Sequence, residues 1–360
     1  ALAIDGAAAL GTNNRIIFAD GISTSGGQTL RFDANNITLT QDIITNTSSA
    51  TIGFGFDTNG NNATLSGTIL STTSTRGLYK FGAGNLTLTA TEMYTGSTQI
   101  FGGTLTLSGA NGSILNSTGT GGFNTSATTY IAPGASLVLD NTSANNNNRL
   151  PDVWDTPFGT GNAASGKLLM NGGEFKIIGH SSGTQEKINQ FDIFVGTVTL
   201  KNNGGGVQLI SGKLNPAVSV GTSAGLIRGD NLGGTPGAGS TNWFVTDLGS
   251  GGVQLSGAGG AEGTPFVNTL AGFAGDASAT GTGTDLLTYA ADTGFRLLTS
   301  SEYTTAIPAS ARAPKCRLWT RATRQASIAR CRPRETISAP PIPRRRGRLN
   351  RPASESNSKS

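Results

Sequence analysis

One pentapeptide of the chain has the residue types of a hydrolase nucleophile. Gly221-Thr222-Ser223-Ala224-Gly225 fits the G-x-S-x-G pattern, in which the serine stands on a sharp turn between a strand and a helix. The pattern also requires a histidine base later in the chain. The only histidine, His180, lies upstream, and the Leu-Ile-Arg-Gly-Asp that follows does not predict a helix. We therefore expect no hydrolase activity through Ser223.

Two glycine-rich stretches imitate phosphate-binding loops. Gly161 to Lys167 follows G-x-x-x-x-G-K, but Leu168 stands where a Ser or Thr would hold magnesium. Residues 159–164 imitate a dinucleotide fingerprint without the surrounding strand-helix-strand pattern. Both stretches predict turns, and we expect no cofactor and no cofactor-binding residue.

Carboxylates suggest a third chemistry, the cleavage of an acidic or neutral polysaccharide. Asp152 and Asp155, with Glu174 nearby, are candidate acids, and Lys167 and Lys176 are the nearby candidate bases. A solvated polar loop explains the same residues without catalysis. We therefore name no catalytic residue, and the sequence predicts a protein that is not an enzyme.

Metal sites and receptor motifs have little support. One histidine and no cysteine in residues 1–306 cannot make a structural zinc site, so we name no metal ligand. Arg228-Gly229-Asp230 spells a tripeptide that some animal-cell adhesion receptors bind. The protein need never meet such a receptor, so we assign the tripeptide no role.

Composition indicates an all-β protein with a separate basic tail. The chain has 53 glycines in 360 residues and only 13% charged residues, a mixture that disfavours helices. Residues 1–306 carry 12 Lys and Arg against 19 Asp and Glu, a net charge of −7. Residues 307–360 carry 14 against 2, a net charge of +12, and contain both cysteines, Cys316 and Cys331. We expect residues 307–360 to be disordered; a linker, a nucleic-acid-binding arm and a shifted reading frame are the interpretations, and the abrupt change favours the last.

A repeat organises residues 1–306. Residues 84–90 (GNLTLTA) align with residues 103–109 (GTLTLSG) at an offset of 19, and looser echoes run from Ile37 to Leu255. Alternating Leu and Thr predict strands with one buried face, and the flanking glycines predict turns. Repeats that cannot bury this face alone must stack. The sequence therefore predicts a right-handed parallel β-helix, a solenoid, with an antiparallel sandwich or barrel as the alternative.

The repeat also predicts a core and two loops. The side chains expected to be buried are Leu86, Leu88, Leu105 and Leu107, with Thr87 and Thr106 facing out. Loops are expected near 141–166, which contains Trp154 and Phe158, and near 229–250, which contains Trp243 and Phe244. These aromatic residues either hold a glycan or, as we favour, fold back on the core.

Residues 81–89 (FGAGNLTLT), 94–100 (YTGSTQI) and 102–107 (GGTLTL) together resemble the autotransporter-associated β-strand repeat. This repeat occurs in passenger regions of large secreted bacterial proteins. The resemblance implies a non-enzymatic structural or adhesive stalk outside the cell, at the cell surface or associated with the outer membrane. It implies surface glycans or other cell-surface components as partners, no cofactor, and membrane contact only through a part of the protein not present here.

Two other functions stay open from the sequence. One is a β-helix that binds or cleaves a polysaccharide, which a carboxylate cluster with a Lys or Arg on one coil face would favour. The other is nucleic-acid binding through the basic tail, which a genuine in-frame tail would support.

Overall fold

A computed structural model gives the fold of a first unit, Ala1–Thr305, and separates it from a second, Ala306–Ser360. The residues that the structure describes are 1–11, 15–19, 28–46, 54–71, 77–94, 96–114, 117–118, 122–123, 128–151, 166–216, 223–246, 255–257 and 259–303. The expected disorder of residues 307–360 falls outside these ranges and stays a prediction. In the ranges given, no helix is long and apolar enough to cross a membrane.

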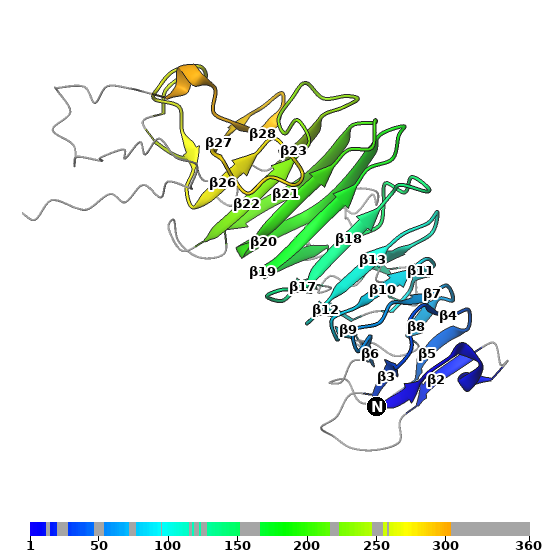
Figure 1. The fold of residues 1–360 in the computed structure, drawn as a ribbon. Coiled ribbons are helices and arrows are strands. Elements are labelled where there is room, and N and C mark those ends of the chain that lie inside the picture. Colours follow the sequence, from blue (N-terminus) through cyan, green and yellow to red (C-terminus); the bar gives the residue numbers. More distant parts are fainter. Residues whose placement is uncertain are drawn as a thin grey trace, which may run out of the picture. The chain divides into compact units, whose positions relative to one another are not determined.

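The first unit is a parallel β-helix whose strands form three ladders (Figure 1). The first ladder contains β1 (Leu2–Ile4), β3 (Gln28–Phe32), β6 (Phe54–Asp57), β9 (Leu78–Phe81), β12 (Thr98–Ile100), β17 (Thr128–Ile131) and parts of β19 (Lys167–Ile178), β20 (Thr184–Lys201) and β21 (Val207–Pro216). The second contains β4 (Ile37–Leu39), β7 (Ala63–Leu65), β10 (Asn85–Leu88), β13 (Thr104–Leu107), β18 (Ser136–Asp140), further parts of β19 and β20, β22 (Ala224–Gly229) and β26 (Phe273–Asp276).

The third ladder is less continuous along the chain. It contains β2 (Arg15–Ala19), β5 (Asp42–Asn46), β8 (Ile69–Ser71), β11 (Thr91–Glu92), β14 (Ser113–Ile114), the starts of β20 and β21, and β23 (Thr241–Val245). The remaining elements are η1 (Ala7–Leu10), β15 (Ser117–Thr118), β16 (Gly122–Phe123), β24 (Leu255–Ser256), β25 (Thr269–Leu270), β27 (Asp285–Ala290), β28 (Gly294–Leu297) and η2 (Ser300–Glu302). Each turn of the chain visits the three ladders in a fixed order, so parallel pairing confirms the predicted solenoid and contradicts the antiparallel alternative.

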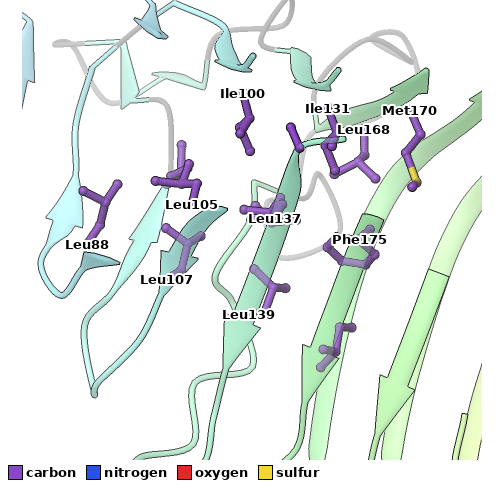
Figure 2. Packing of buried hydrophobic residues seen from close by; sticks show 14 of the residues in the cluster. Leu88, Ile100, Leu105, Leu107, Ile131, Leu137, Leu139, Leu168, Met170 and Phe175 are labelled. Atoms are coloured by element: carbon purple, nitrogen blue, oxygen red, sulfur yellow. The ribbon is translucent and has the colours of Figure 1, made fainter. Parts of the chain in front are cut away.

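The core is a set of side-chain columns between the ladders. Leu88 pairs with Leu107, and Leu107 with Leu139, so identical side chains stack coil upon coil. All three are fully buried, and Figure 2 shows them gathered inside the strands with the neighbouring apolar residues. The four leucines predicted to be buried are buried, with Thr87 and Thr106 at alternate positions in register with each other, as the 19-residue offset requires.

Glycine is needed where the corners of successive coils stack. Gly103 adopts a φ of 63°, and an added Cβ there would collide with the carbonyl oxygen of Gly84. At Gly84 an added Cβ would collide with the carbonyl oxygen of Asn61 in the coil before. Side chains at these corners would therefore force the coils apart.

The repeat echoes in the sequence do not all belong to one ladder. Ile37, Ala63 and Val198 lie in the second ladder, as the alignment predicts. Leu168 lies in the first ladder and Val207 in the third. All three ladders use the same alternation, because each has one buried face, so the pattern alone cannot separate them.

The segment predicted as a loop near 229–250 contains a strand. Trp243 lies in β23, is fully buried and donates from Nε1 to the Ser211 hydroxyl at 2.9 Å. Its ring lies between Phe191, which is tilted against it, and Phe295, which meets it edge to face. The favoured interpretation, in which this aromatic residue folds back on the core, is the one that the structure shows.

An antiparallel hairpin closes the C-terminal end of the described coils. β26 pairs antiparallel with β27, which pairs antiparallel with β28. Within this cap Glu302 accepts hydrogen bonds from the Arg296 guanidinium at 2.7 and 2.8 Å, and from the backbone N–H groups of Gly263 and Thr299. The Arg296 hydrogen bonds lower the pKa of Glu302 to about 2. The cap covers parallel edges that would otherwise pair with another chain.

We predict that Leu107→Ala lowers the free energy of unfolding by about 2–5 kcal/mol, because it leaves a cavity in a continuous column. Thr38→Ala removes an exposed side chain of the same ladder and should change stability by less than about 0.5 kcal/mol. Urea unfolding followed by circular dichroism measures both. Equal effects of the two substitutions would contradict the stacked core.

The cap should be sensitive to acid. The pKa of Glu302 is lower in the folded chain than its ordinary value of 4.5, so its stabilisation is complete above pH 4.5 and lost as the pH falls toward 2. We expect Glu302→Gln to cost about 1–2 kcal/mol at pH 7, after allowance for solvent screening, and progressively less below pH 4.5. Urea midpoints measured from pH 7 to pH 3 provide the test. A constant difference between the two proteins over this range would refute the assignment.

Candidate functional site

The structure does not give Ser223 the surroundings of a nucleophile. Strand β22 follows it directly, where the pattern requires a helix. Its hydroxyl is buried and has no hydrogen-bond partner in the part of the chain that the structure describes. His180 instead contacts the Ser182 hydroxyl through Nδ1, at 2.7 Å. Gly221 and Thr222 lie outside the described residues.

Two of the candidate residues of a polysaccharide-cleaving site, Lys167 and Glu174, are held in separate ion pairs. Lys167 contacts Asp192 across the coils, with Nζ and Oδ2 2.5 Å apart. Gln190 donates to the other oxygen of Asp192 at 2.8 Å. Asp152 and Asp155, like residues 159–165 of the phosphate-loop patterns, lie outside the described residues.

Glu174 belongs to a second polar cluster, on the outer face of the second ladder. Arg228 donates to Glu174 at 2.9 Å and to the Thr199 hydroxyl at 2.9 Å, and Thr199 donates to Glu174 at 2.6 Å. A carboxylate with an arginine on one coil face is therefore present. The three side chains hydrogen-bond to one another across successive coils, which is typical of a structural ladder.

The Arg-Gly-Asp tripeptide is part of the coil. Arg228 and Gly229 end strand β22, and an added Cβ at Gly229 would collide with the Thr241 hydroxyl. Asp230 accepts hydrogen bonds from the backbone N–H groups of Asn202 and Ala279. A receptor would have to break these bonds to reach the tripeptide.

In the described ranges, no three His, Cys, Asp or Glu side chains lie close enough together to hold a metal ion. The buried charges are structural. Arg149 is fully buried and donates to the carbonyl oxygens of Gly109, Gly112 and Asp140, while Glu186 accepts from the N–H groups of Arg149 and Leu150. They fasten the described half of the predicted loop 141–166 to the coils.

A buried lysine lies at a corner of the coil that carries the repeat. Lys80 faces inward between Phe56 and Ile100 in register, and its Nζ lies within 3.0 Å of the Thr58 hydroxyl and the carbonyl oxygens of Phe81, Gly82 and Gly102. Burial lowers the pKa of Lys80 to about 8, although Asp57 opposes the shift. The Phe81 carbonyl oxygen also accepts from Thr58, whereas the ammonium group is the donor that the structure gives to the carbonyl oxygens of Gly82 and Gly102.

Because Lys80 points inward, Tyr79 and Phe81 on either side of it point outward. With rings from the next two coils they form an aromatic surface that the repeat pattern does not predict. Tyr79, Phe81, Phe101 and Tyr130, here called the aromatic face, lie on β9, directly after β12 and on β17. Phe81 and Phe101 stack with ring centroids 5.4 Å apart and planes 8° apart. Phe101 also contacts Tyr79 at 6.0 Å and Tyr130 at 6.2 Å.

Hydrophobic alternation alone does not explain how this strand is oriented. In Leu78-Tyr79-Lys80-Phe81 the pattern favours aromatic residues inside and lysine outside. Leu78 and Lys80 are fully buried instead, while Tyr79 and Phe81 are half-buried. The corner carbonyls around the lysine reverse the expected alternation, and no signal in the strand itself reveals them.

No known protein family, curated protein or solved structure gives a significant match to this chain. The family resemblance of residues 81–107 therefore stays a prediction. Two features of these residues are visible in the structure, the glycine corners and the inward lysine beside them.

We predict that Lys80→Met destabilises the first unit, since the Gly82 and Gly102 carbonyl oxygens lose a donor. Each buried group left unsatisfied costs about 1–3 kcal/mol. Lys201→Met, at an exposed lysine on β20, is the matched control and should have little effect. Urea midpoints at pH 7 compare them. An unchanged midpoint for Lys80→Met would show that water replaces the ammonium group at no cost.

Proposed function

We propose that the chain is a non-enzymatic structural and adhesive stalk, part of a secreted or surface-displayed passenger of the autotransporter type. The observation that carries this proposal is the unbroken parallel register of the second ladder, from Ile37 in β4 to Asp276 in β26. Coils that stack in one direction make a spacer whose length grows with the number of repeats.

The distribution of polar groups supports a structural role. The buried charges Lys80, Arg149 and Glu186 bind backbone groups of corners and loops. The outward pairs Lys167 with Asp192 and Arg228 with Glu174 join successive coils. Side chains used in this way hold coils together and are not free to act on a substrate.

A location outside the cell fits the same features. The described residues contain no cysteine, so the fold does not depend on the redox state of its compartment. The partners proposed are surface glycans or other cell-surface components. Membrane contact is proposed only through a part of the protein outside this chain, and nucleic acid is disfavoured by the net charge of −7 over residues 1–306.

Of the two alternatives, polysaccharide binding has a specific observation in its favour, the aromatic face. Polysaccharide cleavage has less support, since Glu174 and Lys167 are held in ion pairs. Nucleic-acid binding through residues 307–360 concerns a segment outside the described residues.

Surface display predicts that an antibody raised against the full chain labels intact cells of the bacterium that encodes it. Labelling should be as strong on intact cells as on permeabilised cells, and external proteinase K should remove it. An antibody against a cytosolic protein of the same cells is the control for leakage. Labelling that appears only after permeabilisation would refute the proposal.

A further inference from the structure

The aromatic face lies outside the core, so closing the core does not explain it. The inward positions of the same strands are filled by Leu78, Lys80, Ile100 and Ile131, all fully buried. Phe101 nevertheless keeps 43% of its surface exposed. Single exposed apolar residues are ordinary, but four contiguous rings on three successive coils form a patch of the kind that marks an interaction site.

Polar groups that can form hydrogen bonds are interleaved with the rings. Gln99 lies in register between Tyr79 and Tyr130 and is half-buried. On the far side, Asn171 donates from Nδ2 to the Tyr130 hydroxyl at 3.4 Å. A ligand that fits this face therefore presents flat apolar surfaces and hydrogen-bonding groups side by side.

The charges around the aromatic face are balanced at each end. Arg31 forms two hydrogen bonds with Asp33, at 2.7 and 2.8 Å, and the carboxylate of Asp57 also acts on Arg31. At the other end Lys167 neutralises Asp192. Nucleic-acid bases also stack on aromatic rings. A phosphate backbone, however, needs a groove of cationic side chains, and the described residues around the aromatic face form no such groove.

We propose that the aromatic face binds an uncharged polysaccharide. Sugar rings have an apolar C–H face that packs on an aromatic ring and a rim of hydroxyl groups that pair with amide side chains. The polysaccharide would cross the strands of the first ladder from β9 to β17, since the rings follow one another from coil to coil with centroids 5.4 to 6.2 Å apart. This inference rests on the adhesive role proposed above and names its ligand.

Affinity electrophoresis of the full chain tests it, in native gels that contain hydroxyethyl cellulose, galactomannan or dextran as neutral probes and polygalacturonate as the anionic one. We expect retardation by at least one neutral polysaccharide, insensitive to salt. Phe101→Leu keeps apolar bulk but removes the ring, and should weaken binding about tenfold, or about 1.4 kcal/mol. Phe101→Tyr keeps the ring and should retain binding.

Phe266→Ala, at a phenylalanine that is 56% exposed away from the face, is the matched control and should bind as the unaltered protein does. Urea midpoints of all variants separate loss of binding from loss of folding. Three outcomes would overturn the proposal. They are no retardation by any of the three neutral probes, retardation by polygalacturonate alone, and an equal loss of retardation in Phe266→Ala and Phe101→Leu. Such a result would leave surface display, which is tested on intact cells, unaffected.

Discussion

Parallel stacking of successive coils is the constraint on which the rest of this structure depends. Each backbone pairs with the coil before and the coil after, so a residue must find a compatible partner at the same position in both neighbours. Leucine over leucine meets this condition, as in the column from Leu88 through Leu107 to Leu139. At the corners the same condition requires glycine, because the carbonyl oxygen of one coil lies where the Cβ of the next would be.

Corners leave buried backbone groups that the ladders cannot satisfy, and long charged side chains meet that need. Lys80 reaches the carbonyl oxygens of two successive corners, and Arg149 reaches those of a corner and a loop. Glu186 accepts hydrogen bonds from the backbone N–H groups of Arg149 and Leu150. Charge inside this β-helix therefore has a structural explanation, and its cost in desolvation is offset by several hydrogen bonds to each group.

The inward lysine also links the core to the surface. An inward side chain at residue 80 places Tyr79 and Phe81 outside, where they meet Phe101 from the next coil and, through it, Tyr130. Packing within the coil thus decides which aromatic residues solvent and ligands can reach. Trp243, one of the aromatic residues named in the loop predictions, is by contrast buried between two phenylalanines.

The sequence alone determined the repeat unit, the all-β class, the parallel solenoid and the burial of the four central leucines. These follow from local alternation and from the near-identity of residues 84–90 and 103–109, and both can be read along the chain. Tertiary structure decided which ladder each echo of the repeat joins, why Lys80 is inside, and where the aromatic rings meet. Those outcomes depend on contacts between coils, such as Lys80 with Gly102 and Phe81 with Phe101, whose partners are set by how corners stack. The inward direction of Lys80 cannot be read from residues 78–81 alone, because the carbonyl groups of Gly82 and Gly102 that accept from it lie outside the strand.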